Sequence, residues 1–362
     1  MKAKGILALT LALAAAPVLA ATLTLEEAYE NLARGTLAEQ CEAAEYLGVA
    51  GDEAALEPLI VALSDENPEL RQCAAMALGE LGSSRAVPAL ARALGDRDRA
   101  VQWFAATSLA KLGEPAVKML LTELRSDDED AVVGAAIALG RMRERRAVGP
   151  LLELLSSPDL YVREQAIEAL VAIGKPSVGP LVKKLGSADP AVKKSAVVAL
   201  GRLADVEAAA ALVKLLGERD LVARHYAMVA LRGMGPDVYN VLEDALASRN
   251  PSAQKAACEI LGFARDARAI EPVAALLDDD DESVRWTAAK TLGAIDGKYA
   301  VANLIRALQD PSPRVREVTV LALGKIGHFD AVPALTTVAE NDPDDAVRAA
   351  ATDALAAIAG RK

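Results

Sequence analysis

Aromatic residues, histidine and cysteine are all scarce in this chain. Its 362 residues include 2 Trp, 6 Tyr and 3 Phe, although 52% of them are apolar. Ala, Leu and Val carry that apolar content, and Ala and Leu favour helices whereas aromatic residues favour strands. The composition therefore argues against an all-β or doubly wound α/β fold. Disorder is excluded as well, because a chain this apolar can bury a large core.

The charge and the missing motifs exclude several classes of function. The net charge is −11 and the pI is near 4.9, whereas a general nucleic-acid binder needs a positive surface. Phosphate-binding loops, nucleophile elbows and zinc-ligand spacings are absent from the sequence. Two histidines and three cysteines leave little material for a metal site, so we expect neither a metal nor a cofactor.

Residues 1–20 have the features of a cleaved secretory signal peptide. Lys2 and Lys4 form a short basic start, an apolar stretch covers 6–16, and small residues end the segment at Ala20. The apolar stretch is too short for a membrane span, which needs roughly 20 residues. We therefore expect a mature chain of residues 21–362 with a charge of −13, exported to a periplasm or secreted, and without membrane insertion.

Internal repetition dominates the rest of the chain. The segment 70–82 recurs at 284–295 and 315–327, and its pattern aligns throughout the chain at intervals of 30 to 32 residues. The ninth residue is Leu in all eleven copies, and the fifth is Ala in ten, with Thr319 as the exception. Positions one, five, nine and twelve share one face of a helix, so each copy contains an amphipathic helix with a buried stripe. The copies begin at residues 39, 70, 101, 131, 162, 192, 223, 253, 284, 315 and 347.

A second helix is expected between successive copies, as in residues 85–94 and 330–335. Prolines recur near the start of this helix, where a missing N–H costs least. Glycines follow the repeated helix where a left-handed cap would fall, at Gly82, Gly113, Gly174, Gly235 and Gly327. A single helix pair cannot bury both of its apolar faces, so the pairs must stack. The sequence thus predicts an all-α, right-handed solenoid of about eleven helix pairs, forming a single domain over 21–362.

These features resemble HEAT repeats, and the short unit is similar to the HEAT-like repeats named after phycobilisome (bilin) lyases. The resemblance implies that an acidic residue in each inter-unit turn pairs with an arginine six residues later. It also implies that the repeated helices line a concave groove. The pairs with this spacing are Asp65 with Arg71, Glu218 with Arg224, Asp279 with Arg285, Asp310 with Arg316, and Asp342 with Arg348. We expect them to form a structural ladder rather than to bind anions.

Positions three and seven of the repeated helix lie opposite the leucine stripe and would face the groove. Trp103, Val133 and Ile137 come from consecutive copies and could form one apolar patch with Phe104. This patch would either anchor a partner or fill a gap between repeats. His225 and Trp286 occupy the same column further along. A long groove fits a protein or peptide better than a small molecule, so the first hypothesis is an exported, non-catalytic scaffold.

The second hypothesis is a bilin-lyase-like enzyme or tetrapyrrole-binding chaperone, which the type of repeat motivates. A di-iron hydroxylase of the deoxyhypusine hydroxylase type is disfavoured, because neither His225 nor His328 is followed by Glu. The acidic runs 127–130 and 278–282 lack the spacing of a calcium loop and are expected to cap helices. The arginines at 141, 143, 145 and 146 are expected to form a solvated turn.

The three cysteines give no clear framework. Cys258 occupies a small core position. Cys41 and Cys73 belong to adjacent repeats whose helices should lie about 9–10 Å apart, which is long for a disulfide. The sequence therefore requires no bridge, and a catalytic thiol would lack its base.

Overall fold

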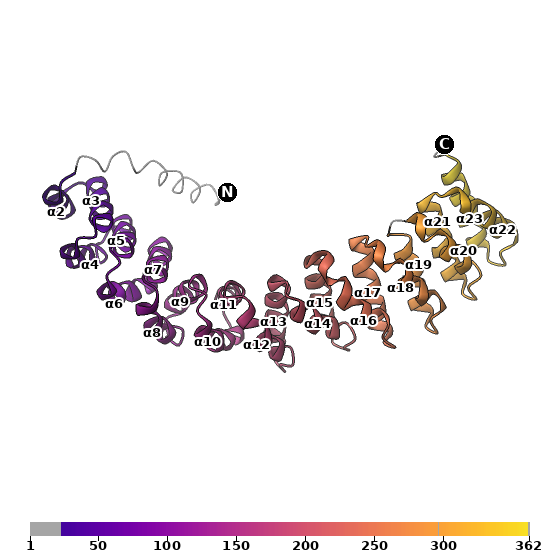
Figure 1. The fold of residues 1–362 in the computed structure, drawn as a ribbon, viewed down its shortest axis with the longest axis horizontal. Coiled ribbons are helices and arrows are strands. Elements are labelled where there is room, and N and C mark those ends of the chain that lie inside the picture. Colours follow the sequence, from indigo (N-terminus) through magenta and orange to yellow (C-terminus); the bar gives the residue numbers. More distant parts are fainter. Residues whose placement is uncertain (1–22, 296, 361–362) are drawn as a thin grey trace. The chain divides into compact units, whose positions relative to one another are not determined.

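A computed structural model describes residues 23–295 and 297–360 of the chain (Figure 1). The segment expected to be a signal peptide lies outside these residues. Throughout the described part the regular structure is helical and contains no strand. No described helix is long and apolar enough to cross a membrane. The chain forms two compact units, unit 1 ending at Ser177 and unit 2 beginning at Val178.

Each unit consists of helix pairs that follow one another along the chain (Figure 1). The repeated helices of unit 1 are α3 (Leu37–Ala50), α5 (Pro68–Leu81), α7 (Arg99–Leu112), α9 (Glu129–Arg141) and α11 (Leu160–Ile173). The helices that precede them are α2 (Leu25–Arg34), α4 (Leu56–Ala62), α6 (Val87–Arg92), α8 (Glu114–Glu123) and α10 (Val148–Glu153). Short 3₁₀ turns flank them: η1 (Glu53–Ala55), η2 (Ser84–Ala86), η3 (Ala93–Gly95), η4 (Arg145–Ala147), η5 (Leu154–Ser156) and η6 (Lys175–Ser177).

Unit 2 continues the same pattern. Its repeated helices are α13 (Pro190–Leu203), α15 (Leu221–Gly233), α17 (Pro251–Ala264), α19 (Glu282–Leu292), α21 (Pro313–Ile326) and α23 (Asp345–Ala359). The preceding helices are α12 (Val178–Lys184), α14 (Val206–Leu215), α16 (Tyr239–Leu246), α18 (Ile270–Ala275), α20 (Val301–Ala307) and α22 (Val332–Asn341). Its 3₁₀ turns are η7 (Gly235–Val238), η8 (Ala267–Ala269), η9 (Leu276–Asp278), η10 (Gly297–Tyr299) and η11 (Phe329–Ala331). The expected all-α solenoid of helix pairs is confirmed, whereas the expectation of one domain stays a prediction.

The core of each unit is the stripe that the sequence predicts. The side chain at the fifth position of every repeated helix, Thr319 included, is fully buried. The ninth-position leucines are buried as well, except for Leu355 in α23, which is partly exposed. Consecutive repeated helices contact each other within each unit, α3 with α5 and α13 with α15 being examples. The buried stripe is therefore the interface between neighbouring repeats.

Glycine at the tenth position brings neighbouring helices close together. A Cβ atom added to Gly48 of α3 would lie 2.6 Å from the carbonyl oxygen of Ala77 in α5, closer than a carbon atom can approach. The five glycines expected to follow helices all have positive φ angles. Gly82 and Gly327 adopt the predicted left-handed cap, whereas Gly113 and Gly174 have ψ angles of −137° and lie outside the left-handed helical region. Arg143, Ala204 and Arg265 also have positive φ angles after α9, α13 and α17, where the sequence has no glycine.

The acidic runs supply helix caps. The Asp128 side chain accepts hydrogen bonds from the backbone N–H groups of Asp130 and Ala131 at the start of α9. Asp281 caps α19 in the same way. Carboxylates at these positions satisfy backbone donors that have no partner within the helix and face the positive end of the helix dipole.

The arginine ladder exists, but its partners differ from those expected. The Arg71 side chain donates through Nε and Nη2 to Asp96 of the following repeat, at 2.8 and 2.7 Å, and through Nη1 to the backbone oxygen of Asp65 at 2.9 Å. The residue six positions earlier thus contributes its carbonyl group rather than its carboxylate. Because the arginine needs only a carbonyl group from the residue six positions earlier, that residue does not have to be acidic. Ser157 occupies this position before Arg163, which donates to the backbone oxygen of Ser157 at 2.6 Å.

The same correction applies in unit 2. Arg285 contacts the carboxylate of Asp310 and the backbone oxygen of Asp279, and Arg316 contacts the carboxylate of Asp342 and the backbone oxygen of Asp310. Arg348 donates to the backbone oxygen of Asp342. The Glu218 and Arg224 side chains, both within the described residues, form no hydrogen bond with each other. Arg71, Arg285 and Arg316 therefore join adjacent repeats through carboxylates and also hold the turn before their own helix through its backbone oxygen.

The expectation that Cys41 and Cys73 need no bridge is wrong. They form a disulfide between α3 and α5, with their Cα atoms 5.4 Å apart. The two residues face each other across the interface, so the Cα separation is shorter than the separation of the helix axes by about twice the 2.3 Å helix radius. An axis spacing of about 9–10 Å is thus compatible with a disulfide.

Candidate partner-binding surface

Trp103 is the largest exposed aromatic side chain of unit 1. It lies on α7, 45% exposed, on the side of the helix away from the buried Val101 and Ala105. The Phe104 ring meets it edge to face, with the ring centroids 5.0 Å apart. Val101 and Ala105 fix α7 in the stack, so the indole is presented from a packed helix.

Arg141, at the end of α9, covers one face of the Trp103 ring. The guanidinium carbon lies 4.6 Å from the ring centroid, and Nη1 donates a hydrogen bond to the hydroxyl of Thr107. The burial of this guanidinium against the indole lowers the pKa of Arg141. The four side chains Trp103, Phe104, Thr107 and Arg141 are referred to below as the Trp103 surface.

Arg141 does not lie in the solvated turn that the sequence predicts, but contacts Trp103 and Thr107. A long side chain in the last turn of a helix points back toward the helix N-terminus, so Arg141 reaches positions three and seven of the preceding repeat. Arg146 of the same basic cluster also has partners, since it forms ion pairs with Glu114 and Glu144 at 2.6 and 2.8 Å.

Val133 is not an exposed anchor, contrary to the prediction. It is 4% exposed and packs in a hydrophobic cluster with Val132 and Val162. Ile137 is partly buried against the same cluster. Of the predicted apolar patch, Trp103 remains exposed and Phe104 is half-buried, while Val133 belongs to the core.

His225 and Trp286 lie on α15 and α19 of unit 2. His225 is exposed, and its ring centroid lies 5.8 Å from that of Tyr226. The Lys194 ammonium lies over the Tyr226 ring, 4.8 Å from its centroid. Trp286 is half-buried, and the Lys290 ammonium lies 5.0 Å from its ring centroid. The structure therefore gives these two residues to a different unit from Trp103, and their part in partner binding stays a prediction.

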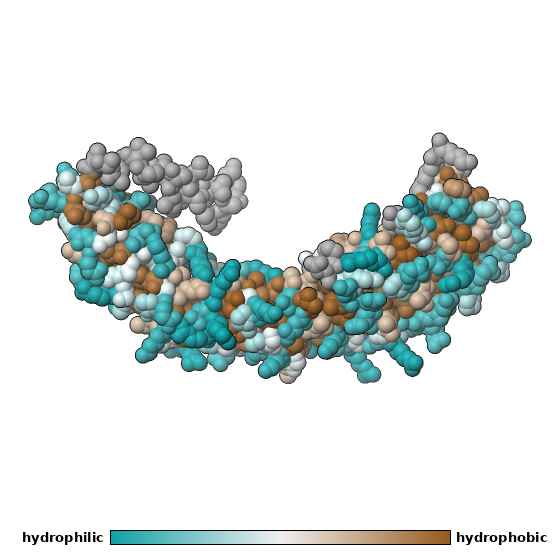
Figure 2. Space-filling model, in the orientation of Figure 1, coloured by the Kyte–Doolittle hydropathy of each residue, from teal (hydrophilic) through white to brown (hydrophobic). Residues whose placement is uncertain are grey.

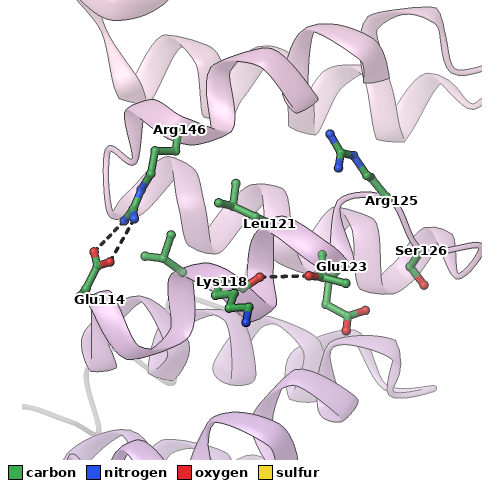
Figure 3. Close-up of a pocket in the computed structure, with 9 residues that line it drawn as sticks. Glu114, Lys118, Leu121, Glu123, Arg125, Ser126 and Arg146 are labelled. Carbon is green, nitrogen blue, oxygen red and sulfur yellow. Dashed lines mark hydrogen bonds and ion pairs between the residues drawn. The ribbon is translucent and has the colours of Figure 1, made fainter.

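A hollow opens beside α8 on the side of the preceding helices (Figure 3). Glu114 and Arg146 form an ion pair at one end, and Leu121 and Lys118 lie along its wall (Figure 3). The hydroxyl of Thr122 donates to the backbone oxygen of Lys118. Glu114 already neutralises Arg146, so this arginine is not a free cation in the hollow.

The free cysteine and the side chains that can bind metals do not form a reactive site in the described part of the chain. Cys258 is buried in α17, and its burial raises the pKa of the thiol to about 12, so it is not a nucleophile at neutral pH. Among the described residues, no cluster of three or more His, Cys, Asp and Glu side chains could hold a metal ion. On the face shown in Figure 2, hydrophobic patches lie among hydrophilic side chains.

Comparisons with known proteins agree with this architecture. The model of the PBS lyase HEAT-like repeat matches residues 192–218. The model of HEAT repeats matches residues 30–96, 56–138, 133–186, 239–298 and 274–356, which together exceed half of the chain.

Two curated relatives have names that refer to phycocyanin or to phycocyanobilin. The uncharacterized phycocyanin operon protein Z of Pseudanabaena tenuis (strain PCC 7409) is 35% identical over 99 residues, covering 25% of this chain and 49% of that protein. The phycocyanobilin lyase subunit alpha of Picosynechococcus sp. (strain ATCC 27264 / PCC 7002 / PR-6) is 28% identical over 238 residues, covering 63% of this chain and 70% of that protein. The chain thus spans about half the length of the first relative.

Solved structures bear on the fold alone. The crystal structure of Kap121p bound to Pho4p matches with a TM-score of 0.52 and 14% identity, covering 92% of this chain and 45% of that one. The repeat pattern, the stacked helix pairs and the family match lead to one conclusion. The chain belongs to the HEAT-repeat proteins.

Proposed function

We propose that this chain is a non-catalytic HEAT-repeat scaffold that binds a protein partner through the Trp103 surface. The observation that carries the proposal is the 45% exposure of Trp103 on a packed helix. Tryptophan and arginine are the side chains most often found at the centre of protein interfaces. Here the two are stacked on each other, and they belong to neighbouring helices of one unit.

The arrangement of α7 and α9 favours binding without a large conformational cost. Both helices are fixed by buried side chains at the repeat interface, among them Ala105 and Leu139. A rigid surface loses little conformational freedom on association, so more of the interaction energy remains as affinity. Covering the indole and its surroundings would also remove exposed apolar area from water.

A crosslinking experiment with a matched control tests this proposal. Purified protein serves as bait in the exported fraction of its host, and the captured proteins are identified by mass spectrometry. Trp103→Glu should abolish capture of the specific partner, because it places a charge in the interface. Phe263→Glu is the control, since Phe263 is 70% exposed on α17 in the other unit. Equal capture by the parent and by Trp103→Glu would refute the assignment of the surface.

The protein is also proposed to work outside the cytoplasm, in a periplasm or as a secreted protein. The disulfide between Cys41 and Cys73 supports this location, since disulfides persist mainly in oxidising compartments. The signal-like segment 1–20 supports it independently. N-terminal sequencing of the protein isolated from its host should find Ala21 as the first residue. A protein that retains Met1 and fractionates with the cytoplasm would contradict the proposal.

A bilin-lyase-like activity is the second candidate, and the named relatives favour it at least as strongly as a non-catalytic role. The similarity to the phycocyanobilin lyase subunit alpha extends over 63% of the chain. A linear tetrapyrrole has a flat conjugated body and carboxylates, which an indole and a guanidinium could both contact. Incubation with phycocyanobilin should then change the visible absorbance and induce circular dichroism. Unchanged spectra at high protein concentration would dispose of this candidate.

A further inference from the structure

We propose that the Trp103 surface recognises a peptide segment in which an aspartate or glutamate lies next to an apolar side chain. Arg141 would bind the carboxylate, and Trp103 and Phe104 would contact the apolar group. This inference rests on the proposed partner-binding function and names the chemistry of the partner.

The hydrogen bonds of Arg141 are the first argument. A guanidinium has five N–H donors, and Arg141 uses one of its nitrogens to donate to Thr107. Within residues 23–295 and 297–360, Arg141 makes no ion pair with a carboxylate. Most of its donors are therefore free for a ligand, although the group is already partly withdrawn from water by the indole.

Other arginines of the fold show what Arg141 lacks. Arg316 is held by Asp342, and Arg146 by Glu114 and Glu144. Arg141 instead donates to the uncharged hydroxyl of Thr107. An arginine that is stacked and partly desolvated but not neutralised attracts a carboxylate strongly, because its planar fork matches the two oxygens.

The stacking of Arg141 on Trp103 orients the guanidinium for a ligand. The indole holds the guanidinium plane in place, so less side-chain entropy is lost when a carboxylate binds. The exposed part of the Trp103 ring and the Phe104 ring beside it lie next to this cation. A ligand that presents a carboxylate alone would leave this apolar area uncovered, whereas an acidic residue beside an apolar one would use both.

The test is a selection from a phage-displayed library of random dodecapeptides on the immobilised full-length protein. Peptides selected by the parent should be enriched in Asp or Glu within two positions of an aromatic residue or leucine. Selection on Arg141→Gln should lose the acidic enrichment and keep the apolar one, and selection on Trp103→Ala should lose both. Arg125→Gln is the matched control, because Arg125 is an exposed arginine of the same unit that lies outside the Trp103 surface.

A double-mutant cycle then measures the contact directly. In the best peptide, replacing the acidic residue by its amide should weaken binding to the parent about tenfold or more, the effect of a charge-assisted hydrogen bond. The same replacement should change little with Arg141→Gln. The comparison of the acidic peptide with its amide form uses only the parent protein, so it remains valid if Arg141→Gln folds poorly.

The outcomes separate this inference from the function on which it rests. Peptides that depend on Trp103 but show no acidic preference would overturn the carboxylate proposal and leave the partner-binding function intact. Acidic peptides that bind Arg141→Gln as tightly as the parent would overturn it as well. Failure to select any peptide that depends on Trp103 would count against both proposals.

Discussion

Arg316 of α21 reaches across to the next repeat and holds Asp342 with two parallel hydrogen bonds, its Nε and Nη2 atoms each 2.8 Å from a carboxylate oxygen. Its Nη1 donates to the backbone oxygen of Asp310 at 2.9 Å. Both side chains are almost completely buried. The pair therefore connects two repeats where water cannot replace either partner.

Removing one member of this pair should destabilise unit 2 strongly. We expect Arg316→Ala to lower the free energy of unfolding by about 3–5 kcal/mol, because it leaves a buried carboxylate without its partner. Urea denaturation followed by circular dichroism measures the change.

Arg314 provides the matched control for that experiment. It lies in the same helix, is largely exposed, and approaches Glu282 only to 3.9 Å. Arg314→Ala should change the free energy of unfolding by less than about 1 kcal/mol. Similar losses for the two variants would contradict the role assigned to Arg316.

The same pair predicts a dependence of stability on pH. The hydrogen bonds from Arg316 hold the pKa of Asp342 below its ordinary value. The stabilisation is therefore fully present above the pKa of the unfolded carboxyl, about 3.9, and is lost as the pH falls through the lower pKa of the folded state. Denaturation midpoints measured from pH 5 to pH 2 should fall less steeply for Asp342→Asn than for the parent. Asp353→Asn, at an exposed position, should keep the slope of the parent.

The sequence predicts the repeats better than the contacts between them. Periodicity alone places the buried leucines from Leu47 to Leu323, because a helix in a stack must repeat its apolar face. Periodicity could not assign the carboxylate that binds Arg316, because Asp310 and Asp342 occupy equivalent positions in successive repeats. Only the stacking of the helices determines that Asp310 contributes its carbonyl group and Asp342 its carboxylate. Arg141 was missed for a related reason, as its contact with Trp103 depends on the direction of a long side chain rather than on spacing.

The accessible thiols should be those of the disulfide and not Cys258. Alkylation with iodoacetamide under native conditions should label nothing before reduction. After mild reduction it should label Cys41 and Cys73, which are half-buried, but not Cys258, whose burial raises the pKa of its thiol to about 12. Peptide mass spectrometry identifies the labelled sites. Rapid labelling of Cys258 in the folded protein would show that α17 is less well packed than described.

Loss of the disulfide should weaken the first repeats. The bridge closes a loop of 32 residues between α3 and α5, and the loop-closure entropy removed from the unfolded chain by a cross-link of this length corresponds to about 3.7 kcal/mol. The variant with Cys41→Ser and Cys73→Ser should therefore melt at a lower temperature than the oxidised parent. It should also become insensitive to dithiothreitol, while the parent loses stability when dithiothreitol is added. Equal melting curves for oxidised and reduced parent would contradict a structural role.

Ala204→Gly should stabilise unit 2, although it removes a methyl group. Ala204 ends α13 with φ 50° and ψ 33°, a left-handed conformation that costs an L-residue about 1–2 kcal/mol and that glycine adopts freely. Its side chain is exposed, so little packing is lost. After the larger entropy of glycine in the unfolded chain is subtracted, a gain of about 0.5–1 kcal/mol remains.

The reverse change at an equivalent site, Gly51→Ala after α3, should destabilise by a similar amount. Gly51 has φ 68° and no atom within 4 Å of an added Cβ, so its loss would come from the backbone alone. Urea denaturation of the two variants decides the matter, and shifts of the same sign would show that the left-handed conformation does not determine stability at these helix ends.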